Sequence, residues 1–204
     1  MTPFLTTTGV AVPLLLDDVN TDQIAPQQMD RGLTPDYRAM LFRRQRQEAD
    51  FILNRPQYRG AAILLGGANF GCGSSRETAV WALMAWGIRC IVTRGFADIF
   101  RENCLQNGVL PLELGERDHG ALAARVIATD GRSPFTVDLV GQRIAGPGGP
   151  DLAFDIAPSD RMRLIEGLDD IGLTLKHVDD IAAWERRTAA AAPWLQTARD
   201  SRAP

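Results

Sequence analysis

Two adjacent hydroxyls followed by a guanidinium are the strongest chemical signal in this 204-residue sequence. Ser74, Ser75 and Arg76 follow a glycine-rich loop, which itself follows the continuously apolar run 61–65. A buried strand, a tight turn and a helix would place these side chains at a helix N-terminus, where unpaired N–H groups and the helix dipole attract anions. The pattern therefore predicts a site for carboxylate or phosphate, and by itself it does not name a reaction.

Three familiar loop motifs do not fit this stretch. A Walker A loop needs a lysine before the hydroxyl, a dinucleotide-binding loop needs a glycine where Arg76 stands, and a nucleophile elbow needs Gly-x-Ser-x-Gly. A simpler alternative is that Ser74 or Ser75 caps the next helix and that Arg76 faces solvent. Gly71 and Gly73 favour the anion site, because a helix cap requires no glycine cradle at the end of a strand.

The segment Gly71-Cys72-Gly73-Ser74-Ser75-Arg76-Glu77 resembles the Gly-x-Gly-Ser-Ser-Arg-Glu loop of the swivelling domain in the aconitase superfamily. With Asn69-Phe70 and Trp81-Ala82-Leu83 added, the chain is similar to the small subunits of 3-isopropylmalate dehydratase. The resemblance covers about residues 8–185 in the family's order. It continues through three further segments, Asp18-Val19-Asn20-Thr21-Asp22-Gln23-Ile24, Gly95-Phe96-Ala97-Asp98-Ile99-Phe100 and Asp170-Ile171-Gly172-Leu173-Thr174-Leu175.

This resemblance implies an activity and assigns roles by position. Family members interconvert 2-isopropylmalate and 3-isopropylmalate in leucine biosynthesis by removing and re-adding water. Carried over to this sequence, Ser74 is the base and Ser75 is its hydrogen-bond partner, while Asp22 orients a serine or an arginine beside the cleft. The candidate catalytic residues are therefore Ser74 and Ser75, and the candidate substrate-binding residues are Arg76, Asp22, Thr21 and Asn69.

The resemblance also implies a partner, because the family's [4Fe-4S] cluster is held by three cysteines of a separate large subunit. The cysteines here, at positions 72, 90 and 104, form no Cys-x-x-Cys pair, and we expect ordinary thiols and no cofactor or metal on this chain. We therefore expect the chain to be inactive alone. Its active site would form with the large subunit, in a heterodimer or heterotetramer that acts on a small hydroxydicarboxylate.

Two positions depart from the family's pattern. Thr78 stands where the family usually has histidine, and Asn20 stands where it usually has aspartate. A related hydro-lyase that acts on another 2-alkylmalate or on a citraconate-like acid therefore stays open as an alternative. A non-catalytic anion-binding module that has lost its partner is the second alternative.

Composition excludes several other classes of protein. With 22 basic and 25 acidic residues the formal net charge is −3, which argues against nucleic acid as a partner. No apolar run approaches the roughly 20 residues of a membrane helix. Three cysteines without a disulfide-like pattern suit a reducing compartment, so we expect a cytoplasmic protein. The two histidines, His119 and His177, are expected at the surface.

The elements that position the site predict an α/β fold with a mostly parallel sheet. Strands are expected near 61–65, 87–92 and from 109, with helices between them, and successive βα units imply parallel pairing. A strand or hairpin is expected within 4–16. Later elements are expected as a helix at 116–128, a hairpin at 133–144, a strand at 152–156, a helix from 158 and a final helix from 181.

The family resemblance implies that this is the three-layer swivelling β/β/α domain. We expect a single such domain over 1–190, with a C-terminal tail at 191–204. The arginine-rich segment 27–59 resembles a polar flap or substrate loop more than core.

Overall fold

The structure is a computed structural model and describes residues 1–26 and 35–195. The chain divides into two compact units, Met1–Leu168 and Asp169–Pro204, which are described separately below. The boundary between them lies earlier than the end of the single domain that was expected over 1–190.

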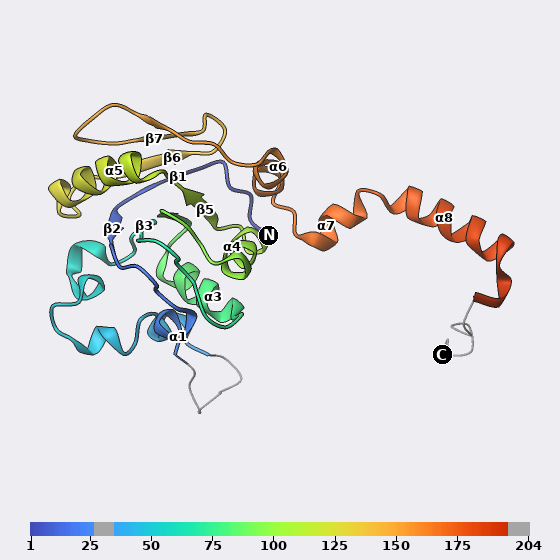
Figure 1. Ribbon diagram of the computed structural model, residues 1–204, viewed down its shortest axis with the longest axis horizontal. Helices are drawn as coiled ribbons and strands as arrows, with labels where there is room; N and C mark the ends of the chain where they lie inside the picture. Colours follow the sequence, from blue (N-terminus) through green and yellow to red (C-terminus); the bar gives the residue numbers. More distant parts are fainter. Residues whose placement is uncertain (27–34, 196–204) are drawn as a thin grey trace. The chain divides into compact units, whose positions relative to one another are not determined.

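A parallel sheet of four strands forms the centre of the first unit (Figure 1). Its order is β2-β3-β4-β5, and each neighbouring pair is parallel. The apolar runs seen in the sequence form these strands because both faces of the sheet are covered. The expected α/β fold is thus confirmed. The strands are β2 (Ala11–Pro13), β3 (Ile63–Leu65), β4 (Cys90–Thr93) and β5 (Leu110–Glu113).

A second, antiparallel sheet has the order β1-β6-β7-β8. Its strands are β1 (Thr6–Gly9), β6 (Phe135–Asp138), β7 (Arg143–Ala145) and β8 (Leu152–Ala153). The possibility of a hairpin within residues 4–16 was wrong, because β1 pairs with β6 whereas β2 pairs with β3. The chain passes from one sheet to the other at Gly9, where an added Cβ would lie 2.7 Å from the Cβ of Ala62.

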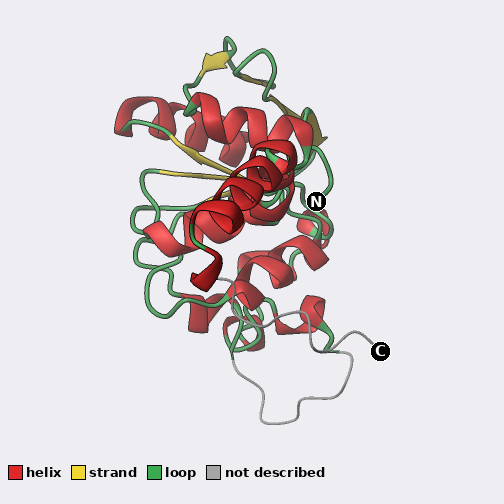
Figure 2. Cartoon of the chain, turned by 90° about the vertical axis from the view of Figure 1, so that its right-hand side faces the viewer, coloured by secondary structure: helices red, strands yellow, loops and turns green. Residues whose placement is uncertain are grey.

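Helices α3 (Glu77–Trp86) and α4 (Asp98–Gln106) cover one face of the parallel sheet, whereas α5 (Glu116–Thr129) and the antiparallel sheet lie over the other (Figure 1; Figure 2 shows the elements coloured by type). Leu64 of β3 belongs to a core with α3 and α4, whereas Ile63 and Leu65 belong to a core with α5 and the second sheet. This alternation along β3 follows from the two-residue period of a strand. The helices of the first unit are α1 (Thr21–Ile24), α2 (Tyr37–Met40), α3 (Glu77–Trp86), α4 (Asp98–Gln106), α5 (Glu116–Thr129) and α6 (Pro158–Glu166).

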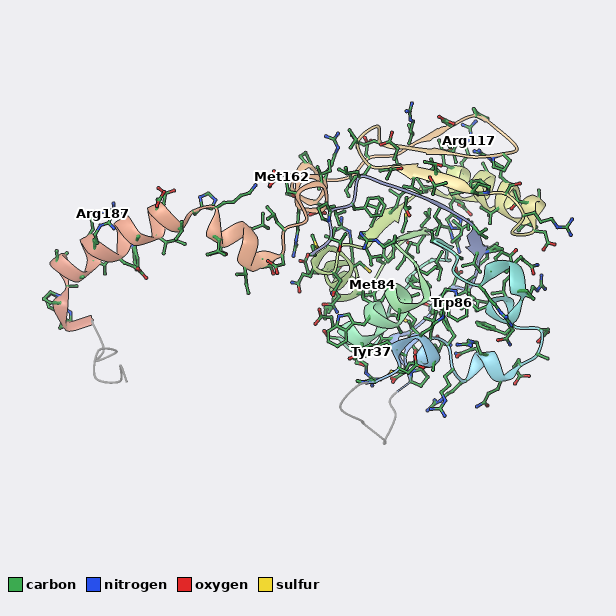
Figure 3. The ribbon with its side chains drawn as sticks, turned by 180° about the vertical axis from the view of Figure 1, so that it is seen from behind. Tyr37, Met84, Trp86, Arg117, Met162 and Arg187 are labelled. Atoms are coloured by element: carbon green, nitrogen blue, oxygen red, sulfur yellow. The ribbon has the colours of Figure 1, made fainter. Side chains whose placement is uncertain are left out.

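The segment expected as a polar flap supplies part of the core. Between α2 and β3 lie three single turns, η1 (Gln45–Gln47), η2 (Ile52–Asn54) and η3 (Pro56–Tyr58). Trp86 of α3 donates a hydrogen bond from Nε1 to the carbonyl of Tyr58 at 3.2 Å, and it lies with Met84 and Tyr37 in this part of the molecule (Figure 3). The buried residues of the segment are Met40, Leu41, Phe42, Leu53 and Tyr58. Residues 27–34 of the expected flap lie outside the described residues.

The second unit contains α7 (Asp170–Leu175), α8 (Val178–Ala191) and the turn η4 (Pro193–Leu195). Asp169 caps α7, because its carboxylate accepts a hydrogen bond from the Gly172 amide at 2.7 Å. Taken over both units, the described part of the chain has no helix long and apolar enough to span a bilayer.

Candidate active site

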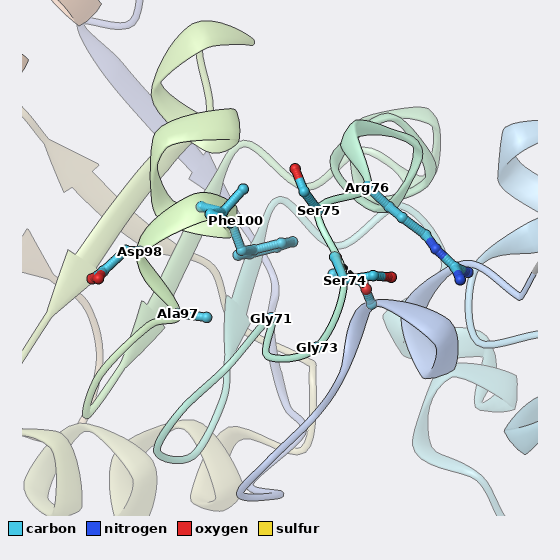
Figure 4. A pocket seen from close by; sticks show the side chains of 10 residues that line it. Gly71, Gly73, Ser74, Ser75, Arg76, Ala97, Asp98 and Phe100 are labelled. Carbon is cyan, nitrogen blue, oxygen red and sulfur yellow. Dashed lines mark hydrogen bonds between the residues drawn. The ribbon is translucent and has the colours of Figure 1, made fainter.

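A small pocket of about 190 Å³ lies beside the glycine loop, at the N-terminal ends of α3 and α4 (Figure 4). Thr21, Ser74, Ser75 and Arg76 line it together with residues of the first turn of α4. Four of the six residues that the sequence singled out are thereby brought to one place. In Figure 4 the ring of Phe100 faces the serines, whereas the carboxylate of Asp98 points away from them.

Backbone hydrogen bonds hold the loop from both sides. On one side the amide of Gly71 donates to the carbonyl of Val19 at 2.7 Å, and the amide of Thr21 donates to the carbonyl of Cys72 at 2.9 Å. On the other side Phe70 exchanges hydrogen bonds with Gly95 and Ala97. The three segments follow β2, β3 and β4, so the pocket lies at the carboxyl edge of the parallel sheet, where open α/β sheets bind ligands.

The serines are exposed and do not cap the helix. The N-cap residue of α3 is Arg76, and no side chain caps this helix, so the alternative in which Ser74 or Ser75 serves as the cap was wrong. The N-cap of α4, Ala97, likewise has no side-chain cap. The N–H groups of two helix ends therefore border the pocket without side-chain acceptors, and each end favours an anion by roughly 0.3–1 kcal/mol.

Thr21 and Asp22 hold the far end of the loop. The hydroxyl of Thr21 donates to the carbonyl of Ser74 at 2.8 Å. A carboxylate oxygen of Asp22 pairs with Nη1 of Arg76, whose side chain is only 21% exposed. Asn20 caps the short helix α1, since its side chain accepts from the Gln23 amide at 2.8 Å. Asp22 is thus placed where it can orient the arginine, and Asn20 has a structural role.

Asn69, like Asp22, does not line the pocket, and unlike Asp22 it has no contact with Arg76. Its side-chain amide donates to the carboxylate of Asp18 at 2.8 Å, and its backbone has a left-handed φ of 52°. The residue therefore ties the start of the loop to the segment after β2.

Sequence reasoning missed a second group of polar contacts that holds the loop. The carboxylate of Asp17 accepts from the amide of Ala68 at 2.7 Å and from Nη2 of Arg94 at 2.6 Å. His119 is only 5% exposed, and its Nε2 lies 2.7 Å from the carbonyl of Gly66, so the expected surface position was wrong. Nothing in the local sequence marks these contacts, because each joins residues more than fifty positions apart.

The contacts of Asp17 predict a pH dependence of stability. The Ala68 amide, and after it Arg94, lower the pKa of the Asp17 carboxyl below its ordinary value. The pKa of Asp17 is therefore lower in the folded than in the unfolded protein. The ionised carboxylate stabilises the fold at pH values above its ordinary pKa, and this stabilisation is lost as the pH falls through the pKa of the folded state. We expect the wild-type melting temperature to exceed that of Asp17→Asn at neutral pH, and the gap to shrink below about pH 4.

Thermal melts of both proteins across the acid range measure this gap. A gap that stays constant as the pH falls below about 4 would contradict the role given to the carboxylate charge.

The cysteines form no cofactor site within the described part of the chain. Cys90 and Cys104 are buried free thiols, and burial raises the pKa of each. Cys72 is partly exposed, and its thiol donates to the carbonyl of Asp18 at 3.4 Å. Among residues 1–26 and 35–195 no group of three or more His, Cys, Asp or Glu side chains could hold a metal ion.

Comparison with known proteins shows which family the chain belongs to. The sequence model of the aconitase C-terminal domain matches residues 1–117, and that of the C-terminal domain of the 3-isopropylmalate dehydratase small subunit matches residues 170–198. A 3-isopropylmalate dehydratase small subunit of Paramagnetospirillum magneticum is 45% identical over 203 residues, which cover 96% of this chain and all of the relative. The chain belongs to the family of 3-isopropylmalate dehydratase small subunits.

Two further similarities agree with this family. The small subunit of Dinoroseobacter shibae is 43% identical over 202 residues, again covering 96% of this chain and the whole relative. A crystal structure of 3-isopropylmalate dehydratase from Methanocaldococcus jannaschii matches with a TM-score of 0.62 and 23% identity, covering 89% of this chain and 99% of that one. At that identity the match shows the fold, which is the fold expected from the sequence.

Proposed function

We propose that this chain contributes the base and the carboxylate-binding groups to a 3-isopropylmalate dehydratase of leucine biosynthesis. One observation carries the proposal. Two exposed serines, Arg76 and the uncapped ends of two helices border one pocket, in a chain whose relatives are small subunits of that enzyme. The substrate class follows from the same chemistry, because hydroxydicarboxylates bring two anionic groups to a site that favours anions.

As a small subunit, the chain implies a large-subunit partner. The exposure of Ser74 and Ser75 supports a shared active site, because bulk water would protonate a serine alkoxide and these hydroxyls must therefore be covered. We propose that the large subunit provides this cover and holds a [4Fe-4S] cluster. When bound there, the cluster would supply the Lewis acidity that helps a hydroxyl group leave.

The part of this chain in the reaction begins at Ser74. A proton on a carbon next to a carboxylate is a weak acid, so its removal needs a strong base in an environment that stabilises negative charge. The alkoxide of Ser74 would meet both needs at the N-terminal end of α3, where the helix dipole stabilises an anion. The C–H bond breaks as the Ser74 alkoxide takes the proton, and its electron pair forms the double bond between the two carbons. The C–O bond breaks at the same time, and the neighbouring hydroxyl leaves with that electron pair as hydroxide. Transfer of the proton from the Ser74 hydroxyl to this hydroxide would give water and restore the alkoxide.

Arg76 and Thr21 would position the substrate and the base. The planar guanidinium of Arg76 suits a carboxylate, since two parallel N–H groups can bind both oxygens. Asp22 already fixes one of its nitrogens, which limits the orientations of the fork. Thr21 holds the Ser74 backbone, so the Oγ atom starts from a fixed main-chain position. Ser75 would donate a hydrogen bond to the alkoxide or to the substrate.

Reconstitution tests the proposal directly. The purified chain is mixed with its large subunit, which is loaded with iron and sulfide under anaerobic conditions, and turnover of 3-isopropylmalate is followed as absorbance of the unsaturated intermediate. We expect turnover by the pair and none by either protein alone. Turnover by this chain alone, or a complex that forms but does not turn over isopropylmalate, would contradict the proposal.

The same assay also tests which substrate the enzyme prefers, because Thr78 stands next to the pocket loop where the family usually has histidine. The same pair is assayed on citraconate and on 2-alkylmalates with shorter side chains. A higher kcat/KM for one of these than for isopropylmalate would assign the chain to the related hydro-lyase instead.

A further inference from the structure

The two helices of the C-terminal unit have no core of their own. Every described residue of α7 and α8 is at least partly exposed. Helices of this length are only marginally stable in water, since most helical stability in proteins comes from packing of an apolar face. These helices therefore need a surface to pack against.

Each of the two helices has apolar residues suited to such packing on neighbouring turns. Ile171 and Leu175 are four positions apart on α7, and large apolar residues recur at intervals of three on α8. Three of them are strongly exposed: Ile171 at 70%, Leu175 at 59% and Trp184 at 59%. We call the set Ile171, Leu175, Val178, Ile181 and Trp184 the apolar stripe.

The charges beside the apolar stripe indicate a protein partner. Helix α8 carries acidic Asp179, Asp180 and Glu185 and, after them, basic Arg186 and Arg187 (Arg187 is labelled in Figure 3). Binding to an anionic membrane or to nucleic acid would require a predominantly basic surface. A rim of mixed charge around exposed Trp and Leu is instead typical of a protein interface.

We propose that the apolar stripe docks this chain onto the large subunit of the dehydratase. The inference rests on the proposed function and adds an attachment site to it. The model of the aconitase C-terminal domain matches residues 1–117 of the first unit, and a model specific to dehydratase small subunits matches residues 170–198. A domain at the end of a longer chain is held by its covalent link, whereas a separate small subunit must hold its partner by non-covalent contacts. The stripe lies in the segment that carries the small-subunit signature.

Titration of the full-length chain with the purified large subunit tests the inference. The dissociation constant is measured by calorimetry, and kcat is measured at saturating large subunit. We expect Trp184→Asp and Leu175→Asp each to raise the dissociation constant more than about tenfold, because a charge would replace a buried anchor of the interface. We expect kcat at saturation to change by less than about twofold, because neither residue lines the pocket.

Ala190→Asp is the matched control. It introduces the same carboxylate, with the same change of one charge, on the same helix six residues from Trp184, and positions i and i+6 do not share a helix face. We expect its dissociation constant to stay within about twofold of wild type. An equal loss of affinity in the control would overturn the inference, because charge rather than the stripe would then control association.

The other possible occupants predict different results. If the stripe packs on the first unit of the same chain, Trp184→Asp lowers the melting temperature of the free chain and leaves the affinity for the large subunit unchanged. If it packs on a second copy, sedimentation of the free chain shows a dimer that Trp184→Asp dissociates. Either result overturns the inference. A wild-type pair that associates through the stripe but does not turn over isopropylmalate would refute the proposed function alone.

Discussion

Replacing Ser74 with alanine is expected to lower kcat of the reconstituted enzyme by about 10²–10⁴-fold, which is the range for loss of a catalytic base. KM should change much less, because Arg76 and the helix ends continue to bind the substrate carboxylates. The measurement is initial-rate kinetics on isopropylmalate at saturating large subunit. Binding of the variant to the large subunit, measured in the same titration, is expected to match wild type.

The structure separates this effect from a loss of stability. Ser74 does not cap α3, and Thr21 contacts its main-chain carbonyl, which alanine retains. The free energy of unfolding of Ser74→Ala is therefore expected to stay within about 0.5 kcal/mol of wild type. Ser159→Ala removes an exposed hydroxyl from the first turn of α6 and should change neither kcat nor stability. A loss of about 1 kcal/mol or more in Ser74→Ala, with kcat retained, would mean that the hydroxyl stabilises the fold and is not the base.

The parts of the fold that local sequence determines were predictable. The βα units from β3 to β5 follow from apolar runs with helical segments between them, as the sequence predicted. The loop at 71–76 was predictable for a different reason, since glycines, hydroxyls and arginine occur there in a sequence-local order.

The parts that long-range packing determines were not predictable. Phe42 has the arginine-rich neighbourhood of a surface segment, and only its packing with the core around Trp86 explains why it is buried. His119 is buried because α5 begins over the end of β3, where the Gly66 carbonyl provides a partner for its ring. The sequence predicted Asn69 as a substrate-binding residue. In the structure its side-chain amide instead donates a hydrogen bond to Asp18, which is 51 residues away in sequence. A pattern of residue types does not reveal such pairings.

Glycine at position 71 is expected to be the most sensitive point of the loop. Its φ is +79°, and an added Cβ would lie 2.1 Å from Cγ of Phe100. Gly71→Ala is therefore expected to lower the free energy of unfolding by about 2–5 kcal/mol, from left-handed strain of about 1–2 kcal/mol and overpacking of about 1–3 kcal/mol. Denaturant unfolding of the full-length chain measures the loss.

Gly73→Ala is the matched control because it carries the strain without the clash. Its φ is +92°, but the nearest atom to an added Cβ is the Cβ of Asn20 at 3.5 Å, an ordinary contact. Its expected cost is about 1–2 kcal/mol. Phe100 is itself held by ring contacts with Phe70 and Phe96. The amount by which Gly71→Ala lowers the free energy of unfolding beyond Gly73→Ala then measures how firmly Phe100 fixes the loop. Equal losses in the two variants would mean that Phe100 moves aside, and the aromatic cluster would not determine where the serines lie.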